Sequence, residues 1–224
     1  MNVNSFVDEL ASVRLPNVFN PYRDTCPLHD APKATAQRRQ NLASMLDSLL
    51  DLGSDTVWMG RDLGYRGGRR TGLALTDEAH LPWVARVYRG ASAVRTTRGD
   101  AIPERTAAEI WGALPQLDIP PLLWNVFPFH PHEGGDGMSN RKFSASELAQ
   151  AEELNAQLFE GLGIRRAISI GQDAASYAQR FGLKVSTVRH PSYGGTSEFR
   201  AGIAAIYGLR LVRPGAASTQ SALF

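Results

Sequence analysis

Three polar residues lie where predicted strands end, and their side chains could take part in one reaction. Asp62 follows the apolar run 55–60, Asn125 lies in the run 120–127, and His190 follows the run 184–189. Ligands of parallel α/β sheets bind at the carboxyl ends of the strands. We therefore expect the three side chains to face one cleft.

A carboxylate, an amide and an imidazole in one cleft suit the hydrolysis of an N-glycosidic bond. Asp62 could stabilise the cationic sugar and orient or deprotonate the attacking water, while His190 donates a hydrogen bond to the departing base. Asn125 offers a donor and an acceptor, which can bind two adjacent edge atoms of a pyrimidine. This chemistry requires no metal or other cofactor. Taken singly, each residue also has a structural reading, such as a turn cap for Asp62 or a backbone partner for Asn125.

The elements that would position these residues alternate between strand and helix. Apolar runs predict strands at 55–60, 120–127, 166–171 and 184–189, and helical spacing predicts helices at 36–52, 104–114, 144–162, 173–181 and 197–207. Ser144 and Glu147 form a predicted capping box. This alternation indicates an α/β fold, with three αβα layers around a mostly parallel four-stranded sheet. We expect a single domain over residues 1–224, with a flexible tail from about 214 to 224.

Composition narrows the function classes. The chain has 224 residues, 43% hydrophobic and 21% charged, which is enough for one substantial core. The net charge of +2 gives no global basic field, so contact with nucleic acid would depend on local arginines. The single cysteine, Cys26, excludes a disulfide framework and a zinc finger. The start does not resemble a signal peptide and no apolar run is long enough to span a membrane, so we expect a cytoplasmic protein.

Three motifs, in order along the chain, resemble the uracil-DNA glycosylase superfamily. The segment from Gly60 to Thr76 resembles the first motif, in which a strand ends in a short turn before a Gly-rich loop. Leu122-Leu-Trp-Asn125 resembles the segment that supplies the base-binding asparagine, and Arg189-His-Pro-Ser-Tyr-Gly-Gly195 resembles the His-Pro-Ser motif that enters the DNA. Phe127-Pro-Phe-His-Pro131 with Asn140 resembles a bacterial branch. The resemblance covers roughly residues 36–207 and implies a uracil-DNA glycosylase-like fold.

The resemblance assigns roles to these positions. Asp62 would activate water, Asn125 would bind the base, and His190 would be the catalytic histidine. The remaining base-binding residues would be Gly64, Tyr65 and Leu75. Ser192 would contact a DNA phosphate, and Tyr193 or the adjacent Gly194 would fill the gap left by the flipped nucleotide. The expected partner is DNA, with no membrane association and a monomeric chain.

The sequence departs from the family pattern beside the base. Leu63 replaces a proline after the acidic residue, Gly64 stands where uracil-specific members have a tyrosine against the 5-methyl position, and Leu75 replaces the stacking aromatic. Each of the last two changes removes bulk. We therefore hypothesise a roomier pocket that could admit thymine, hydroxymethyluracil or glucosylated hydroxymethylcytosine of phage DNA as well as uracil.

Basic and histidine-rich segments allow further interpretations. Arg66, Arg69 and Arg70 follow Asp62 closely and are expected to contact DNA phosphates. His130, His132, Glu133 and Asp136 could form a metal site, but they lack helical i, i+4 spacing, and we expect a loop that shapes the DNA groove. No lysine is adjacent in sequence to the three central residues, which predicts a monofunctional glycosylase, although folding could bring Lys142 or Lys184 close.

Two other classes remain open. The chain could be a non-catalytic nucleotide- or DNA-binding α/β module whose Gly/Arg loop cradles phosphate, although no P-loop or Gly-x-Gly-x-x-Gly sequence is present. It could also be an unrelated hydrolase, although it lacks a Gly-x-Ser-x-Gly elbow. Abasic-site formation that is lost in Asp62→Asn would distinguish the glycosylase from both.

Overall fold

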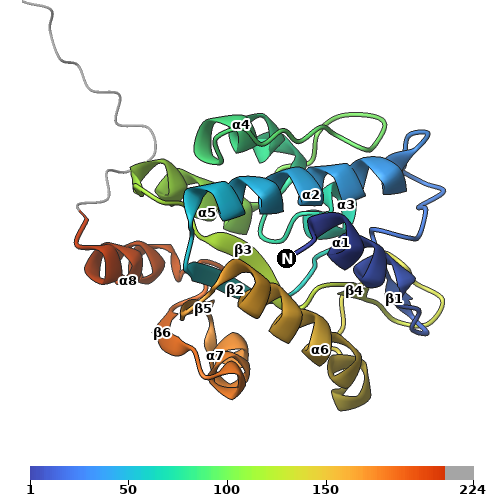
Figure 1. Cartoon of the computed structure of the whole chain (residues 1–224). Coiled ribbons are helices and arrows are strands. Elements are labelled where there is room, and N and C mark those ends of the chain that lie inside the picture. The colour runs from blue at the N-terminus through green and yellow to red at the C-terminus, as the bar shows by residue number, and fades with distance from the viewer. Residues whose placement is uncertain (210–224) are drawn as a thin grey trace, which may run out of the picture.

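The computed structural model describes residues 1–209 and contains a parallel sheet between two layers of helices (Figure 1). The predicted tail at 214–224 lies outside the described residues. The four long strands pair in the order β3-β2-β5-β6, every pair parallel. A separate two-stranded antiparallel sheet joins β1 to β4. The strands are β1 Val18–Phe19, β2 Thr56–Asp62, β3 Leu122–Phe127, β4 His130–Pro131, β5 Arg166–Ile170 and β6 Lys184–Val188.

The helices lie on both faces of the sheet, as the alternating sequence pattern predicts. Helices α6 and α7 cover one face, and α2, α5 and α8 lie on the other (Figure 1). The α-helices are α1 Val3–Ser12, α2 Ala34–Leu52, α3 Gly68–Thr71, α4 Val84–Val87, α5 Arg105–Ala113, α6 Ala145–Leu162, α7 Gln172–Ala178 and α8 Thr196–Tyr207. Short 3₁₀ helices are η1 Glu78–Trp83, η2 Leu114–Gln116 and η3 Gln179–Phe181.

Local signals explain where several helices begin and end. Ser144 accepts the backbone N–H of Glu147, whose side chain accepts the backbone N–H of Ser144, so the predicted capping box of α6 is confirmed. Gly163 closes the same helix in the left-handed conformation, with φ of 69°. Helix α2 ends in the same way at Gly53, where φ is 63°. None of the helices in the described part of the chain is long and apolar enough to span a membrane.

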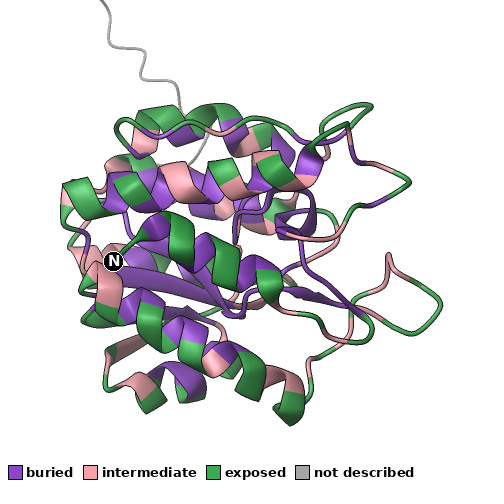
Figure 2. Ribbon diagram, turned by 45° about the vertical axis from the view of Figure 1, so that its right-hand side comes forward, coloured by how far each residue is buried: buried purple, intermediate pink, exposed green. Residues whose placement is uncertain are grey.

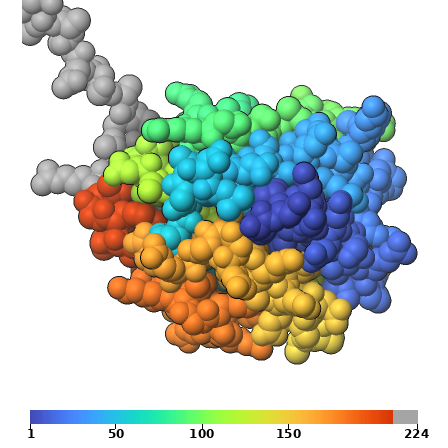
Figure 3. All heavy atoms as spheres, in the orientation of Figure 1, coloured from blue at the N-terminus to red at the C-terminus, as the bar shows by residue number. Residues whose placement is uncertain are grey.

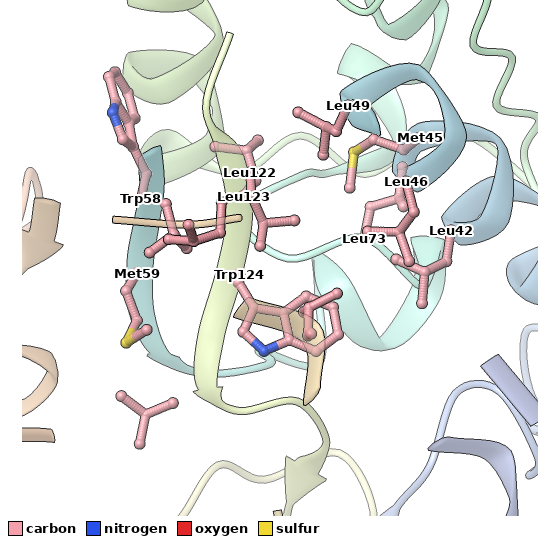
Figure 4. Packing of buried hydrophobic residues seen from close by; sticks show 14 of the residues in the cluster. Leu42, Met45, Leu46, Leu49, Trp58, Met59, Leu73, Leu122, Leu123 and Trp124 are labelled. Atoms are coloured by element: carbon pink, nitrogen blue, oxygen red, sulfur yellow. The ribbon is translucent and has the colours of Figure 1, made fainter. Parts of the chain in front are cut away.

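The core fills the space between the sheet and the helices. Figure 2 shows a buried sheet and helices whose outer faces are exposed. In Figure 4 the apolar face of α2, which carries Leu42, Met45 and Leu49, points toward Leu73 and strand β3. Trp58 bridges the sheet to α8, because its indole N–H donates to the Tyr207 hydroxyl at 2.9 Å. Burial of such side chains stabilises the fold by roughly 1.5–3 kcal/mol each.

The N-terminal helix α1 closes the edge of the molecule beside β3. Val3, Phe6, Val7 and Leu10 are buried, and the Phe6 ring contacts the Trp124 ring at a centroid distance of 6.2 Å. Helices α1, α2 and α6 form a continuous surface on this side (Figure 3). The edge of the sheet next to β3 is therefore covered, and polar groups of β3 are shielded from water.

Candidate active site

Asp62, Asn125 and His190 line one cleft at the carboxyl ends of the strands. Asp62 is the last residue of β2, Asn125 lies within β3, and His190 comes two residues after β6. The cleft has a volume of about 880 Å³. A ligand in it could therefore contact a carboxylate, an amide and an imidazole from three strands of one sheet.

Asn125 is held by its strand, yet its side chain is left free to bind. The residue is 1% exposed, and within residues 1–209 its Oδ1 is the one buried side-chain polar atom without a hydrogen-bond partner. A buried acceptor left unpaired costs about 1–3 kcal/mol. Gly60 is its partner in the register of β2 and β3, and a Cβ on Gly60 would lie 2.5 Å from Oδ1. The glycine therefore makes room for an amide that is prepared for a ligand.

The Asp62 carboxylate is buried and paired with its sequence neighbour. Its side chain is 9% exposed, and Arg61 Nε donates to Asp62 Oδ2 at 2.7 Å. Burial raises the pKa of Asp62, while Arg61 opposes the rise without cancelling it. Arg61 Nη1 also lies 3.8 Å from Asp173 Oδ2, so two carboxylates share this guanidinium. Asp62 is therefore a fixed carboxylate of raised basicity that lines the cleft.

The hydrogen bonds of His190 define its tautomer. Its Nδ1 accepts the backbone N–H of Ser192 at 3.2 Å and lies 2.7 Å from the Ser192 hydroxyl oxygen. An Nδ1 that accepts an N–H carries no proton, so in the neutral ring the proton is on Nε2. Burial, with the charges of Arg61 and Arg189, lowers the pKa of His190. A neutral imidazole can therefore donate from Nε2.

The loop after His190 presents an aromatic side chain at the rim of the cleft. Tyr193 is 97% exposed, lines the cleft and has a left-handed backbone with φ of 49°. Gly194 follows with φ of 81°. A Cβ on Gly195 would collide with the His190 carbonyl oxygen, so the turn requires glycine there. The turn holds Tyr193 outward, and packing against residues 1–209 does not account for its position.

The residues expected to bind the base divide into two groups. Leu75 and Gly64 line the cleft, and Leu75 Cδ2 would lie 3.0 Å from a Cβ on Gly60. Tyr65 does not line it. The Tyr65 hydroxyl instead accepts a hydrogen bond from Arg66 Nε at 3.0 Å, which turns the ring toward that arginine. The prediction that Tyr65 faces the base is not supported by its position.

The prediction that Arg69 and Arg70 contact DNA is wrong, because both are buried. They are 6% and 5% exposed and belong to the short helix α3, where sequence reasoning expected a loop. Arg69 lies over the Phe19 ring at 3.7 Å and bonds His130 Nδ1, while Arg70 pairs with the buried Glu78 at 3.0 Å. Both guanidinium groups therefore make their contacts inside the protein. Arg69 and Arg70 are therefore not available for the phosphate cradle of the binding-module alternative.

His130 also has an interior role. It is fully buried, and its Nε2 donates to the Ser139 carbonyl at 2.9 Å while Nδ1 accepts from Arg69. Burial, with the charge of Arg69, lowers the pKa of His130 to about 4. Residues 1–209 hold no group of three His, Cys, Asp or Glu side chains arranged to bind a metal. His130 instead connects α3 to the 139–140 loop, and Asn140 of that loop lines the cleft.

The two lysines considered at the sequence level differ in position. Lys184 begins β6 and lies at the opposite end of the sheet from the cleft. Lys142 Nζ lies 3.8 Å from Asp173 Oδ2, and Asp173 lines the cleft. The Lys142 side chain is 73% exposed. The fold therefore brings Lys142 to the mouth of the cleft, paired with a carboxylate.

Sequence reasoning missed Glu104, which also lines the cleft. It stands at the N-cap position of α5, 42 residues after Asp62 in the chain. Burial raises the pKa of its carboxyl group. The residue lies in no family-like motif, so only the folded chain reveals its position.

Comparisons with known proteins identify the fold. No family model matches the chain, and no curated protein matches it significantly. Among solved structures, the chain is similar to SMUG2 of Pedobacter heparinus, a protein of the uracil-DNA glycosylase superfamily, at 15% sequence identity. The TM-score is 0.58, and the match covers 91% of this chain and 95% of the other. The predicted uracil-DNA glycosylase-like α/β fold is therefore confirmed.

Proposed function

We propose that this chain is a DNA glycosylase of the uracil-DNA glycosylase superfamily, which hydrolyses the bond between a flipped pyrimidine and its deoxyribose. The observation that carries the proposal is the buried, unpartnered Asn125 Oδ1 in the cleft that also contains Asp62 and His190. The similarity of the fold to SMUG2 is consistent with this activity. The product would be an abasic site.

Asn125 is proposed to bind the base. A uracil-like base presents N3–H beside a carbonyl at C4, which match the acceptor and the donor of one carboxamide. The base would supply the hydrogen bond that Oδ1 lacks in the protein. A site whose polar groups are left unpaired by the wrong ligand discriminates strongly against it.

Asp62 and His190 are proposed to stabilise the charges that develop on the sugar and on the base during the reaction. As the C1′–N1 bond breaks, its electron pair goes to the base and the sugar becomes cationic. The Asp62 carboxylate would stabilise the cation and orient water, whose proton it accepts as the oxygen bonds to C1′. His190 Nε2–H would donate to the base O2 as negative charge develops there. The raised pKa of Asp62 suits proton acceptance, and the lowered pKa of His190 keeps a neutral donor.

The exposed turn after His190 is proposed to enter the DNA. Tyr193, with Gly194 beside it, would occupy the space left by the flipped nucleotide, since an aromatic ring can stack on the adjacent bases. Ser192 holds His190 and would also contact a phosphate. Arg66 is exposed and would contribute a phosphate contact that positions the strand.

The reaction is proposed to be monofunctional. A lyase step would need an uncharged amine near C1′, whereas Lys142 is exposed and paired with Asp173. Water oriented by Asp62 would therefore be the nucleophile.

The base is proposed to be uracil or a pyrimidine with a substituent at C5, such as glucosylated hydroxymethylcytosine of phage DNA. The cleft has a volume of about 880 Å³, and Gly64 and Leu75 form part of its wall. This is more space than one pyrimidine base needs. The first activity would serve repair, and the second would serve defence against phage.

The proposal is tested by incubating the protein with duplexes that carry one U, T opposite G, 5-hydroxymethyluracil or glucosylated hydroxymethylcytosine. Alkali cleavage and mass spectrometry would then detect abasic sites and free base. We expect release of at least one of these bases by the wild type. Tight DNA binding with no base released would contradict the proposal and favour a binding module.

A further inference from the structure

Glu104 occupies a capping position without acting as a cap. It is the N-cap residue of α5, yet its side chain makes no hydrogen bond to the first turn of that helix. Its backbone N–H donates to Asp77 Oδ2 at 2.5 Å, and Asp77 is fully buried. The backbone is therefore fixed from inside the protein, while the carboxylate turns to the cleft.

The Gly-rich turn after Asp62 makes room for this carboxylate. A Cβ on Gly67 would collide with Glu104 Oε2, and a Cβ on Gly64 would lie 3.3 Å from Oε1. The space that Gly64 leaves beside the base is therefore occupied in part by a carboxylate. The wall there is polar, which refines the sequence-based expectation of a simply roomier pocket.

Within residues 1–209, the Glu104 carboxylate has no partner that explains its position. Among the ion pairs and side-chain hydrogen bonds of residues 1–209, none involves its oxygens. The nearby charges are the Asp77 carboxylate, which disfavours ionisation, and Arg66, which favours it; burial and Asp77 together raise the pKa of Glu104. A half-buried carboxylate without a donor from the protein can accept a hydrogen bond from a ligand in the cleft.

Glu104 and His190 lie beside the ends of different, non-adjacent strands of the sheet. Glu104 rests on the turn that follows β2, whereas His190 follows β6, and β5 lies between these strands. In a pyrimidine ring, O2 and the C5 substituent project to opposite sides. A base with O2 toward His190 and its N3–C4 edge at Asn125 therefore directs its C5 substituent toward the Glu104 side.

We infer that Glu104 determines specificity by accepting a hydrogen bond from a hydroxyl group on the C5 substituent of the flipped pyrimidine. The inference rests on the proposed function and assigns the substrate class more narrowly, to hydroxymethylated pyrimidines and their derivatives. A 5-methyl group would desolvate the carboxylate and give no hydrogen bond in return. Uracil has no substituent at C5, so the Glu104 carboxylate would remain hydrated when uracil is bound.

Thymine and 5-hydroxymethyluracil, both placed opposite G, test this inference because they differ by one hydroxyl group. Single-turnover excision of both, and of U, would be measured for the wild type, Glu104→Ala, Glu104→Gln and the control Glu160→Ala, whose side chain is exposed on α6. Since the intrinsic reactivity of each base is the same for every variant, a change in the hydroxymethyluracil-to-thymine ratio isolates the residue. A lost charge-assisted hydrogen bond corresponds to roughly 10- to 100-fold.

We expect Glu104→Ala to lower that ratio by roughly 10- to 100-fold with little effect on U, Glu104→Gln to have an intermediate ratio, and Glu160→Ala to match the wild type. An unchanged ratio in Glu104→Ala, or an equal loss on all three bases, would overturn the inference while leaving the proposed function intact. A wild type that releases no base would instead overturn the proposed function, and the inference with it.

Discussion

Gly60 and Asn125 face each other across neighbouring strands, and a Cβ on Gly60 would stand 2.5 Å from the Asn125 side-chain oxygen. The backbone of Gly60 is not in the left-handed region, so alanine is excluded there by space rather than by conformation. The absence of a side chain at Gly60 in β2 therefore leaves the space that the Asn125 amide occupies in the cleft.

Gly60→Ala is expected to displace the Asn125 amide and lower base excision by about 10²-fold, because small misplacements of a positioning group have effects of this size. Single-turnover rates and thermal melting would be measured together. The matched control is Gly134→Ala, where a Cβ would meet its nearest atoms at 3.8 Å. Wild-type rates in Gly60→Ala would show that the amide position is unimportant.

Excision should rise with pH through the titration of Asp62. Burial raises the pKa of this carboxyl above the ordinary value of 3.8, so the ionised form that accepts a proton is lost at a higher pH than for an exposed aspartate. The rate–pH profile of kcat at acidic pH would reveal this limb. A profile for Asp62→Asn that keeps the same acidic limb would assign it to another group.

His130 should make the protein less stable as the pH falls from 6.5 toward 4. Its pKa is lowered to about 4 in the folded state, so in this window only the unfolded state binds the proton. The free energy of unfolding should decline by about 3 kcal/mol from this group, since one pH unit is worth about 1.4 kcal/mol. Urea titrations at several pH values would measure the slope. His130→Gln, which cannot titrate, should show a shallower decline, and an identical slope would exclude this role.

The arginines of the 66–70 segment should separate into two phenotypes. Arg70→Ser should destabilise the fold by about 3–5 kcal/mol, because it leaves the buried Glu78 carboxylate unpaired. Arg66→Ser should leave melting unchanged and reduce the slope of log affinity against log salt by about one, as expected for a lost phosphate contact. A stable Arg70→Ser variant with weakened DNA binding would restore the sequence-based interpretation of this residue.

Tyr193→Ala should impair excision from duplex DNA by roughly tenfold, since base–aromatic stacking is worth about 1–3 kcal/mol. The side chain is 97% exposed, so stability should not change. Single-stranded substrate, in which no gap has to be filled, serves as the internal control. Equal losses on both substrates would argue against insertion into the duplex.

Much of the fold was predictable because its signals are local. The strands ending near Asp62 and His190 are short apolar runs, and the box formed by Ser144 and Glu147 marks a helix start without tertiary information. Helix α1 was not predicted, although Phe6 and Leu10 lie at helical spacing, because a helix of ten residues is stabilised mainly by its packing against the rest of the protein.

The remaining site features depend on contacts distant in sequence. The burial of Arg69 depends on Phe19, 50 residues earlier, and a Gly- and Arg-rich stretch gives no sign that it folds inward. Glu104 reaches the cleft because Asp77 fixes its backbone, a pairing that no periodicity records. The motifs therefore predicted the site residues at the strand ends. The burial of Arg69 and the position of Glu104 depend instead on tertiary contacts.

The most direct test is single-turnover release of free base from a duplex carrying the preferred pyrimidine, compared among the wild type, Asp62→Asn and His190→Ala. The proposed mechanism predicts abasic DNA and free base in equal amounts from the wild type, and rates lower by about 10²- to 10⁴-fold in both variants, with unchanged melting temperatures. Undiminished release by folded Asp62→Asn would contradict it.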